Sequence, residues 1–158
     1  MAITRLVRSA LVLTVAAAAA CLDTNAPEAK TIEETIFASS LGVNIAASTK
    51  TPNGGYYRDI VAGTGEAVQT GDSLAVRYTG WLSNGTQFDS NLSASEPLWF
   101  KLGAGQVIDG FDETMVGARV GGKRQLIIPP SLGYGPYDYG PIPGNSVLVF
   151  SVELISVK

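Results

Sequence analysis

The sequence predicts an α+β domain in which a curved antiparallel β-sheet wraps around one short α-helix. From residue 54 onward, short stretches with strand-like alternation are separated by glycine-containing turns. One stretch near residues 108–117 instead spaces its apolar residues by three and four, which is the helical period. Because a lone amphipathic helix has only the sheet to pack against, we expect it on the concave face, with an aromatic-lined cleft between the two.

Three strands and a hairpin are predicted before the helix. In the second strand, Leu74, Val76 and Tyr78 share one face. Asn84 and Gly85 then lie between strand-like flanks, and this dipeptide favours a hairpin turn in which both central residues have positive φ. The strands are predicted at residues 56–61, 73–79 and 97–102, and the hairpin at residues 81–88.

One helix and two further strands complete the predicted domain. Ile108, Phe111 and Met115 lie on one helical face. Acidic residues come early in this helix, where its dipole favours negative charge. The last strands are predicted at residues 123–128 and 147–155, and the loop between them contains five of the chain's eight prolines.

Residues 1–21 have the pattern of an export signal. Two arginines precede an apolar stretch that is too short for a comfortable transmembrane helix and ends in small residues. The chain's single cysteine, Cys21, follows directly and resembles the lipidated cysteine of bacterial lipoproteins, although the usual leucine three places earlier is Ala18. We therefore expect an exported protein, anchored through a lipid on Cys21 to a cell-envelope membrane, with its domain facing the periplasm or the cell exterior. The alternative is ordinary cleavage after an Ala-x-Ala site, which leaves a soluble exported protein with a free thiol.

Residues 22–50 are predicted to be a tether, and residues 51–158 the folded domain. The tether is polar and mixed and has no strand alternation. Residues 31–37 could form a short helix within it. Such a helix would serve either as a docking or dimerisation segment or, more simply, as a spacer between the lipid and the domain.

Composition excludes several classes of function. The chain has no histidine, which rules out every histidine-based catalytic triad and argues against a transition-metal enzyme. After Cys21 there are nine basic and fourteen acidic residues, a net charge of -5. An acidic domain without a basic run is a poor candidate for binding nucleic acid. We expect no metal and no cofactor.

Three groups of motifs resemble the signatures of the FKBP family, in the right order and spacing over residues 54–158. The first is Val76-Arg-Tyr-Thr-Gly80 followed by Asn84-Gly-Thr-Gln-Phe-Asp-Ser90. The second is Gly103-Ala-Gly-Gln-Val-Ile108 with Gly110, Phe111 and Gly117. The third comprises Gly121-Gly-Lys-Arg124, Ile128-Pro129, Tyr134-Gly135 and Leu148-Val-Phe150.

This resemblance implies a peptidyl-prolyl cis-trans isomerase that holds proline in an apolar aromatic pocket without covalent chemistry. Its partners would be proline-containing unfolded or nascent exported polypeptides, and the family's macrolide ligands. By family position, the catalytic residues would be Tyr78, Asp89, Ile108 and Tyr134. The substrate-binding residues would be Phe88, Phe100, Val107, Phe111, Ile142 and Phe150.

Several positions depart from the family pattern. The pocket floor, often tryptophan in the family, is Phe111, and Leu98 replaces a common aromatic residue. No arginine lies in residues 90–96, where relatives have one that pairs with the residue matching Asp89. We expect Asp89 to be a buried carboxylate, which is costly unless it is hydrogen-bonded, and we expect Tyr78 to be its partner.

Two other readings of the sequence stay open. The first is a non-catalytic chaperone or binding module on the same fold. The second is an exported β-sandwich adhesin or substrate-binding lipoprotein, for which Trp81 and Trp99 could serve as stacking residues.

Overall fold

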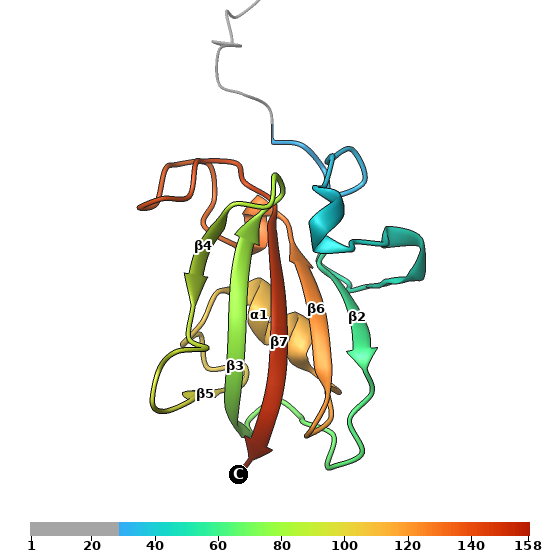
Figure 1. Ribbon diagram of the computed structural model, residues 1–158, viewed down its shortest axis with the longest axis vertical. Coiled ribbons are helices and arrows are strands. Elements are labelled where there is room, and N and C mark those ends of the chain that lie inside the picture. Colours follow the sequence, from blue (N-terminus) through green and yellow to red (C-terminus); the bar gives the residue numbers. More distant parts are fainter. Residues whose placement is uncertain (1–28) are drawn as a thin grey trace, which may run out of the picture.

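The computed structural model describes residues 29–158, so the predicted signal segment and Cys21 lie outside the described residues. Seven strands form an antiparallel sheet in the order β1-β2-β6-β7-β3-β4, and β5 also pairs with β3 (Figure 1). The strands are β1 (Thr49–Lys50), β2 (Tyr56–Val61), β3 (Ser73–Leu82), β4 (Gln87–Ser90), β5 (Leu98–Lys101), β6 (Lys123–Ile128) and β7 (Leu148–Val157). The helical elements are α1 (Asp109–Met115) and the 3-10 turns η1 (Ser39–Leu41), η2 (Ile45–Ala47) and η3 (Pro130–Leu132).

This architecture confirms the predicted fold class. Strands β2 and β6 occupy the predicted residues, whereas β3 and β7 are longer than expected. The two strands pair along most of their length and form the centre of the sheet. Strand β1 was not predicted, since its two residues show no periodicity and are strand-like only because they pair with Tyr56 and Tyr57.

The hairpin between β3 and β4 forms at the expected place but with a different turn. Only Gly85 has a positive φ, of 89°. Asn84 contributes through its side chain, because its Oδ1 accepts a hydrogen bond of 2.9 Å from the Thr86 N–H. The Thr86 carbonyl in turn accepts a hydrogen bond from the Leu82 N–H, which closes the turn.

Helix α1 packs on the concave face of the sheet, as expected. Phe111 and Met115 are buried in the main hydrophobic core. The helix comes closest to the sheet at Gly110, where a Cβ atom would lie only 2.4 Å from Ile128 Cγ2. Arg124 joins the C-terminal end of the helix to β6, because its Nη1 donates 2.9 Å hydrogen bonds to the Thr114 and Val116 carbonyls.

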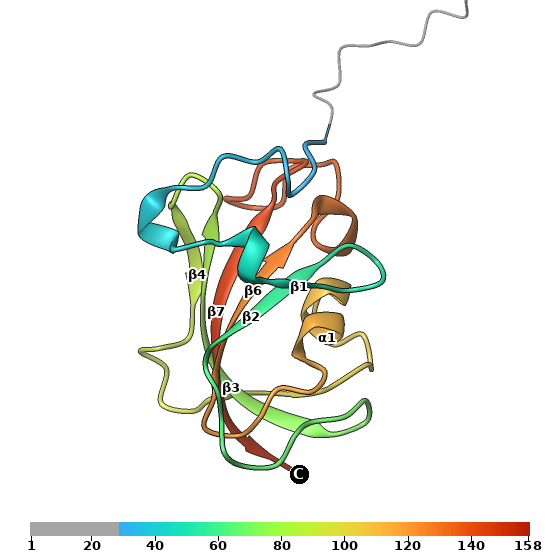
Figure 2. The same ribbon diagram turned by 90° about the vertical axis from the view of Figure 1, so that its right-hand side faces the viewer.

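The N-terminal segment, residues 29–48, covers the opposite face of the sheet. In Figure 2 this blue-to-cyan segment and α1 lie on different sides of the strands. Its Ile32 is only 2% exposed and belongs to a second core cluster with Ile127 and Val149. The described part of the predicted tether therefore contributes to the core of the domain, and the folded unit begins well before the expected boundary at residue 51.

The short helix expected over residues 31–37 is absent, and a turn stands in its place. The Thr35 N–H donates to the Ile32 carbonyl at 3.2 Å, and Thr31 and Glu34 exchange side-chain hydrogen bonds across the turn. The apolar spacing that suggested a helix instead reflects packing on the sheet, since Ile32 and Phe37 both contact the second core cluster. No helix in residues 29–158 is long and apolar enough to cross a membrane.

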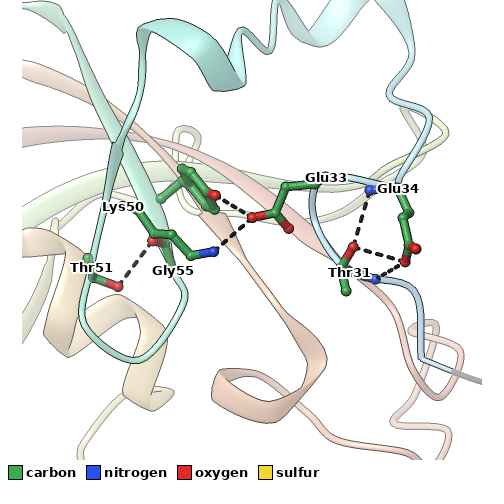
Figure 3. A network of polar contacts seen from close by, with 7 residues as sticks. Thr31, Glu33, Glu34, Lys50, Thr51 and Gly55 are labelled. Carbon is green, nitrogen blue, oxygen red and sulfur yellow. Dashed lines mark hydrogen bonds and ion pairs between the residues drawn. The ribbon is translucent and has the colours of Figure 1, made fainter.

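A polar network joins the N-terminal segment to β1 and β2 (Figure 3). Glu33 Oε1 accepts a hydrogen bond from Lys50 Nζ at 2.8 Å and another from the Tyr56 hydroxyl. These hydrogen bonds, led by that from Lys50, lower the pKa of Glu33 from 4.5 to about 2. The network fixes the segment to the sheet edge that β1 and β2 form.

Candidate active site

An aromatic cavity of about 180 Å³ lies between α1 and the concave face of the sheet. Phe111 forms its floor and meets three other rings nearly edge-on, with centroid distances of 5.4 Å to Phe150, 5.7 Å to Phe100 and 6.2 Å to Tyr78. Edge-to-face contacts are a preferred geometry for aromatic rings, so the four residues hold one another in place. The cavity is lined by Tyr78, Asp89, Leu98, Gln106, Val107, Ile108, Phe111, Tyr134 and Phe150.

Seven of the ten pocket residues named from the sequence line this cavity. The other three, Phe88, Phe100 and Ile142, do not line it but belong to the same hydrophobic core or pack against it. Phe88 supports Phe150 at a centroid distance of 5.5 Å, as Phe100 supports Phe111. Phe88 and Phe100 therefore support the rings of the pocket wall.

Gly80 in β3 makes room for the rings. A Cβ atom there would lie 2.7 Å from Phe88 Cζ and 2.8 Å from Phe150 Cε1. Both rings therefore cross the strand at a point where only glycine fits. A glycine inside an otherwise regular strand was the signal in the sequence for this close approach.

Tyr78 and Asp89 form the predicted pair on one side of the cavity. The Tyr78 hydroxyl donates to Asp89 Oδ2 at 2.6 Å, which confirms the expected partner. Burial, followed by this hydrogen bond to a carboxylate, raises the pKa of Tyr78 well above its usual range. The Tyr78 proton is therefore held on the phenol and directed at Asp89.

The expectation that Asp89 is buried is wrong. Its side chain is exposed at the rim of the cavity, and its Oδ1 accepts a 2.8 Å hydrogen bond from the Ser90 N–H. Strand β4 lies at the edge of the sheet, so nothing in residues 29–158 covers this carboxylate from outside. Water can solvate it on that side, so burial does not force it to have a partner.

Ile108 lies at the start of α1 and is half-buried in the cavity wall. Its carbonyl already accepts hydrogen bonds from the Phe111 and Asp112 N–H groups. Its own N–H has no acceptor within residues 29–158, as expected for the first N–H groups of a helix. This donor can bind a peptide carbonyl.

Tyr134 lies across the cavity on the proline-rich loop. Its ring stacks on Tyr139 with a centroid distance of 4.6 Å and an interplanar angle of 14°. Burial, together with the nearby Tyr139 and Asp89, raises the pKa of Tyr134, so its hydroxyl stays protonated. This hydroxyl makes no hydrogen bond to residues 29–158 and can donate one to a ligand.

Sequence reasoning missed two features of this site. Gln106 lines the cavity and is held in place because its Oε1 accepts a 2.7 Å hydrogen bond from the Lys101 N–H. Tyr139 stacks on Tyr134, although it is outside the motifs and lies in a loop without periodicity. Larger concavities occur elsewhere in the described residues, with volumes of about 740, 390, 270 and 240 Å³, but none of these four gathers several aromatic rings around polar donors.

Comparison with known proteins agrees with this arrangement. The family model described as "FKBP-type peptidyl-prolyl cis-trans isomerase" matches residues 64–155, which is more than half of the chain and includes every residue that lines the cavity. The chain belongs to the FKBP family. Its domain is a peptidyl-prolyl cis-trans isomerase.

Similar sequences come from bacteria and eukaryotes. The FK506-binding protein of Neisseria meningitidis serogroup B is 48% identical over 100 residues, covering 63% of this chain and 92% of that protein. FK506-binding protein 2 of Dictyostelium discoideum is 54% identical over 91 residues, covering 57% of this chain and 68% of that protein.

Two solved structures share the fold. FkpA from Escherichia coli has a TM-score of 0.64 and 41% identity, over 71% of this chain and 52% of that one. AtFKBP13 also has a TM-score of 0.64, with 36% identity, over 70% of this chain and 98% of that one. The FKBP domain described here therefore matches only about half of the FkpA chain.

Proposed function

We propose that this FKBP domain accelerates rotation of X-Pro bonds in exported polypeptides by enclosing the proline ring in the aromatic cavity. The observation that carries this proposal is the convergence of two free donors, the Ile108 N–H and the Tyr134 hydroxyl, on a cavity with aromatic walls. An apolar enclosure with donors at its mouth fits a proline ring and its neighbouring carbonyl groups.

The chemistry needs no nucleophile. Rotation about an amide bond breaks its conjugation and costs about 18–20 kcal/mol, so the uncatalysed reaction takes tens of seconds or more. In the twisted state the carbonyl loses dipolar character and needs less hydration. A cavity poor in water therefore favours the twisted amide over the planar one, which is differential binding of the transition state.

Each group has a separate role in this proposal. The rings of Phe111 and Phe150 grip the pyrrolidine ring, and Phe88 and Phe100 keep these two rings in position. The Ile108 N–H binds a peptide carbonyl, and the Tyr134 hydroxyl donates a second hydrogen bond. Asp89 holds Tyr78 and places a negative charge beside the carbonyl carbon of the twisting amide.

An isomerisation assay tests the proposal. The fragment should begin at residue 29 because the N-terminal segment is part of the core. Purified fragment 29–158 is expected to speed cis-trans exchange of a Leu-Pro or Phe-Pro peptide. Exchange at the uncatalysed rate with folded protein would contradict the assigned roles and favour the chaperone alternative, for which suppression of client aggregation is the direct measurement.

Macrolide binding is the second part of the proposal, since the similar proteins are named for binding FK506. We expect weaker binding here, because Leu98 replaces an aromatic residue at the rim and is 37% exposed. The neighbouring loop contains no arginine in residues 90–96 and is held by an arginine from the sheet. Arg77, on β3, donates hydrogen bonds to the carbonyls of Asn91, Ala94 and Ser95. Calorimetry that shows no binding, with peptide activity intact, would contradict this part.

Location in the cell envelope is the third part, and it rests on the sequence. A signal-like segment followed by Cys21 supports export and lipidation of this cysteine. Cys21→Ser is expected to release the protein from the membrane fraction or to stall its processing. Wild-type protein that is soluble and carries no acyl chain by mass spectrometry would refute the anchor.

A further inference from the structure

A second concavity, the outer cleft, lies on the sheet face opposite the aromatic cavity. It has a volume of about 390 Å³, which lies within the usual range for small-ligand sites. The N-terminal segment forms one wall and four strands form the floor. Its lining residues are Ser40, Leu41, Gly42, Arg58, Ile60, Trp81, Lys123, Gln125, Val149 and Ser151.

The charges of the outer cleft are all positive. Arg58 and Lys123 line it, and no acidic residue does. The ion pairs formed within residues 29–158 join Lys50 to Glu33 and Arg124 to Asp59, so neither cation of the cleft has a carboxylate partner there. Glu153 lies opposite Lys123 in the register of β6 and β7, so Arg58 is the cation of the cleft without an acidic residue opposite it, and it marks the place for an anion.

Arg58 is the more informative of the two, because the residue is half-buried and its guanidinium is bonded only to neutral groups. Its Nη2 donates to the Gly42 carbonyl at 2.8 Å and to Gln125 Oε1 at 3.4 Å. Its Nε is buried and has no partner among the described residues. A partly dehydrated guanidinium with such partners gains from a nearby anion, and its Nη1, which makes no hydrogen bond to residues 29–158, is the donor left for a carboxylate.

Arg124 shows the contrast within the same sheet. Its Nε and Nη2 form a bidentate ion pair with the Asp59 carboxylate, at 2.6 and 3.0 Å respectively. Its Nη1 donates to carbonyls at the C-terminal end of α1. All three nitrogens have acceptors, so this arginine is satisfied by the fold. The guanidinium of Arg58, in contrast, has no carboxylate partner among residues 29–158.

The rest of the outer cleft suits an apolar group attached to that anion. The Trp81 indole, Leu41 and Val149 provide apolar surface, and the hydroxyls of Ser40 and Ser151 lie at the same cleft. We propose that the outer cleft binds the C-terminal carboxylate of a polypeptide that ends in an apolar or aromatic residue. The choice of a polypeptide rests on the proposed isomerase function, since a second contact with the same class of chain would raise the domain's avidity for it.

Tryptophan fluorescence can report this binding. Trp81 lines the outer cleft, whereas Trp99 is elsewhere, under Lys158 Nζ at 4.5 Å. The variant Trp99→Phe of the full chain leaves Trp81 as the sole tryptophan. The probe is the proline-free peptide acetyl-Ala-Ala-Leu-Phe, used as the free acid and as the C-terminal amide, which differ only in the terminal charge.

We expect saturable binding of the acid and at least tenfold weaker binding of the amide. In the Trp99→Phe background, Arg58→Gln should weaken binding of the acid about tenfold and Lys123→Gln about threefold. Lys101→Gln, which removes an exposed charge outside the cleft, should change nothing. All variants should keep isomerase activity on short proline peptides, which shows that they fold and separates failure of this proposal from failure of the isomerase function.

Several results would overturn the proposal. Equal affinity for acid and amide would show that no carboxylate is recognised. Unchanged binding in both Arg58→Gln and Lys123→Gln would remove the cleft from the interaction. Binding of 3-phenylpropionate as tight as that of the peptide acid would exclude a polypeptide terminus as the preferred ligand.

Discussion

Replacing Asp89 with valine separates catalysis from structure at the aromatic cavity. The side chain is exposed and its hydrogen bonds go to the Tyr78 hydroxyl and the Ser90 N–H. Interactions of exposed charges contribute little to folding, so we expect the free energy of unfolding to fall by no more than about 1 kcal/mol. The rate should fall more, because the variant removes the charge that acts on the twisting amide, and a charged interaction of this kind is worth about as much as a hydrogen bond to a charged group, about 1.5–3 kcal/mol, or on the order of ten- to a hundredfold in rate.

Tyr78→Phe is the matched variant, because it removes the same 2.6 Å hydrogen bond from the other side and leaves the carboxylate in place. If Asp89 acts on the twisting amide, Asp89→Val should lose more activity than Tyr78→Phe. The measurements are kcat/KM on a Leu-Pro peptide and the urea midpoint, for both variants. Full activity of Asp89→Val, or loss that only follows unfolding, would refute the role assigned to this carboxylate.

Four further predictions concern the pocket and the N-terminal segment. Phe111→Ala opens a cavity under three rings and should lower the free energy of unfolding by about 3–5 kcal/mol, measured by urea denaturation; a loss below 1 kcal/mol would contradict its place in the core. Tyr139→Ala removes the ring that stacks on Tyr134, a contact worth about 0.5–1.5 kcal/mol, and should lower kcat/KM roughly two- to tenfold. The control is Tyr137→Ala, at an 81% exposed residue of the same loop, which should leave kcat/KM unchanged. Ile32→Ala should lower the free energy of unfolding by about 2–5 kcal/mol, measured by urea denaturation, if the N-terminal segment belongs to the core. An unchanged free energy of unfolding would show that the segment is only a tether. The pKa of Glu33 is about 2 in the folded protein, against an ordinary value of 4.5, so its contribution to the free energy of unfolding is present above pH 4.5 and is lost as the pH falls toward 2. The difference in urea midpoint between wild type and Glu33→Gln should therefore shrink over that interval. A difference that is independent of pH would contradict the ion pair.

Local patterns in the sequence were enough to predict the elements around the aromatic cavity. The strands at residues 56–61 and 123–128 were predicted to the residue, and the helix nearly so. Their periods of two and of three to four arise from which side chains face the core, and that information lies within each segment. The resemblance in motifs then named seven residues that line the cavity, because the order of motifs along the chain reflects their order in the fold.

Local patterns did not predict contacts between distant segments. Asp89 is exposed because β4 is an edge strand, and no residue near it in the sequence carries that information. Phe88, Phe100 and Ile142 were expected among the substrate-binding residues and do not line the cavity, because the place of a side chain in a core depends on how several strands stack.

The amino-acid sequence by itself determined the strand and helix periods, the Asn-Gly turn and the aromatic set of the isomerase pocket. The tertiary structure decided what covers the other face of the sheet. Ile127 and Val149 point away from α1 and need apolar cover, and the N-terminal segment provides it with Ile32. A segment without strand or helix periodicity gives no local sign of such packing, because the residues that bury it, Ile127 and Val149, are about a hundred residues away in the chain.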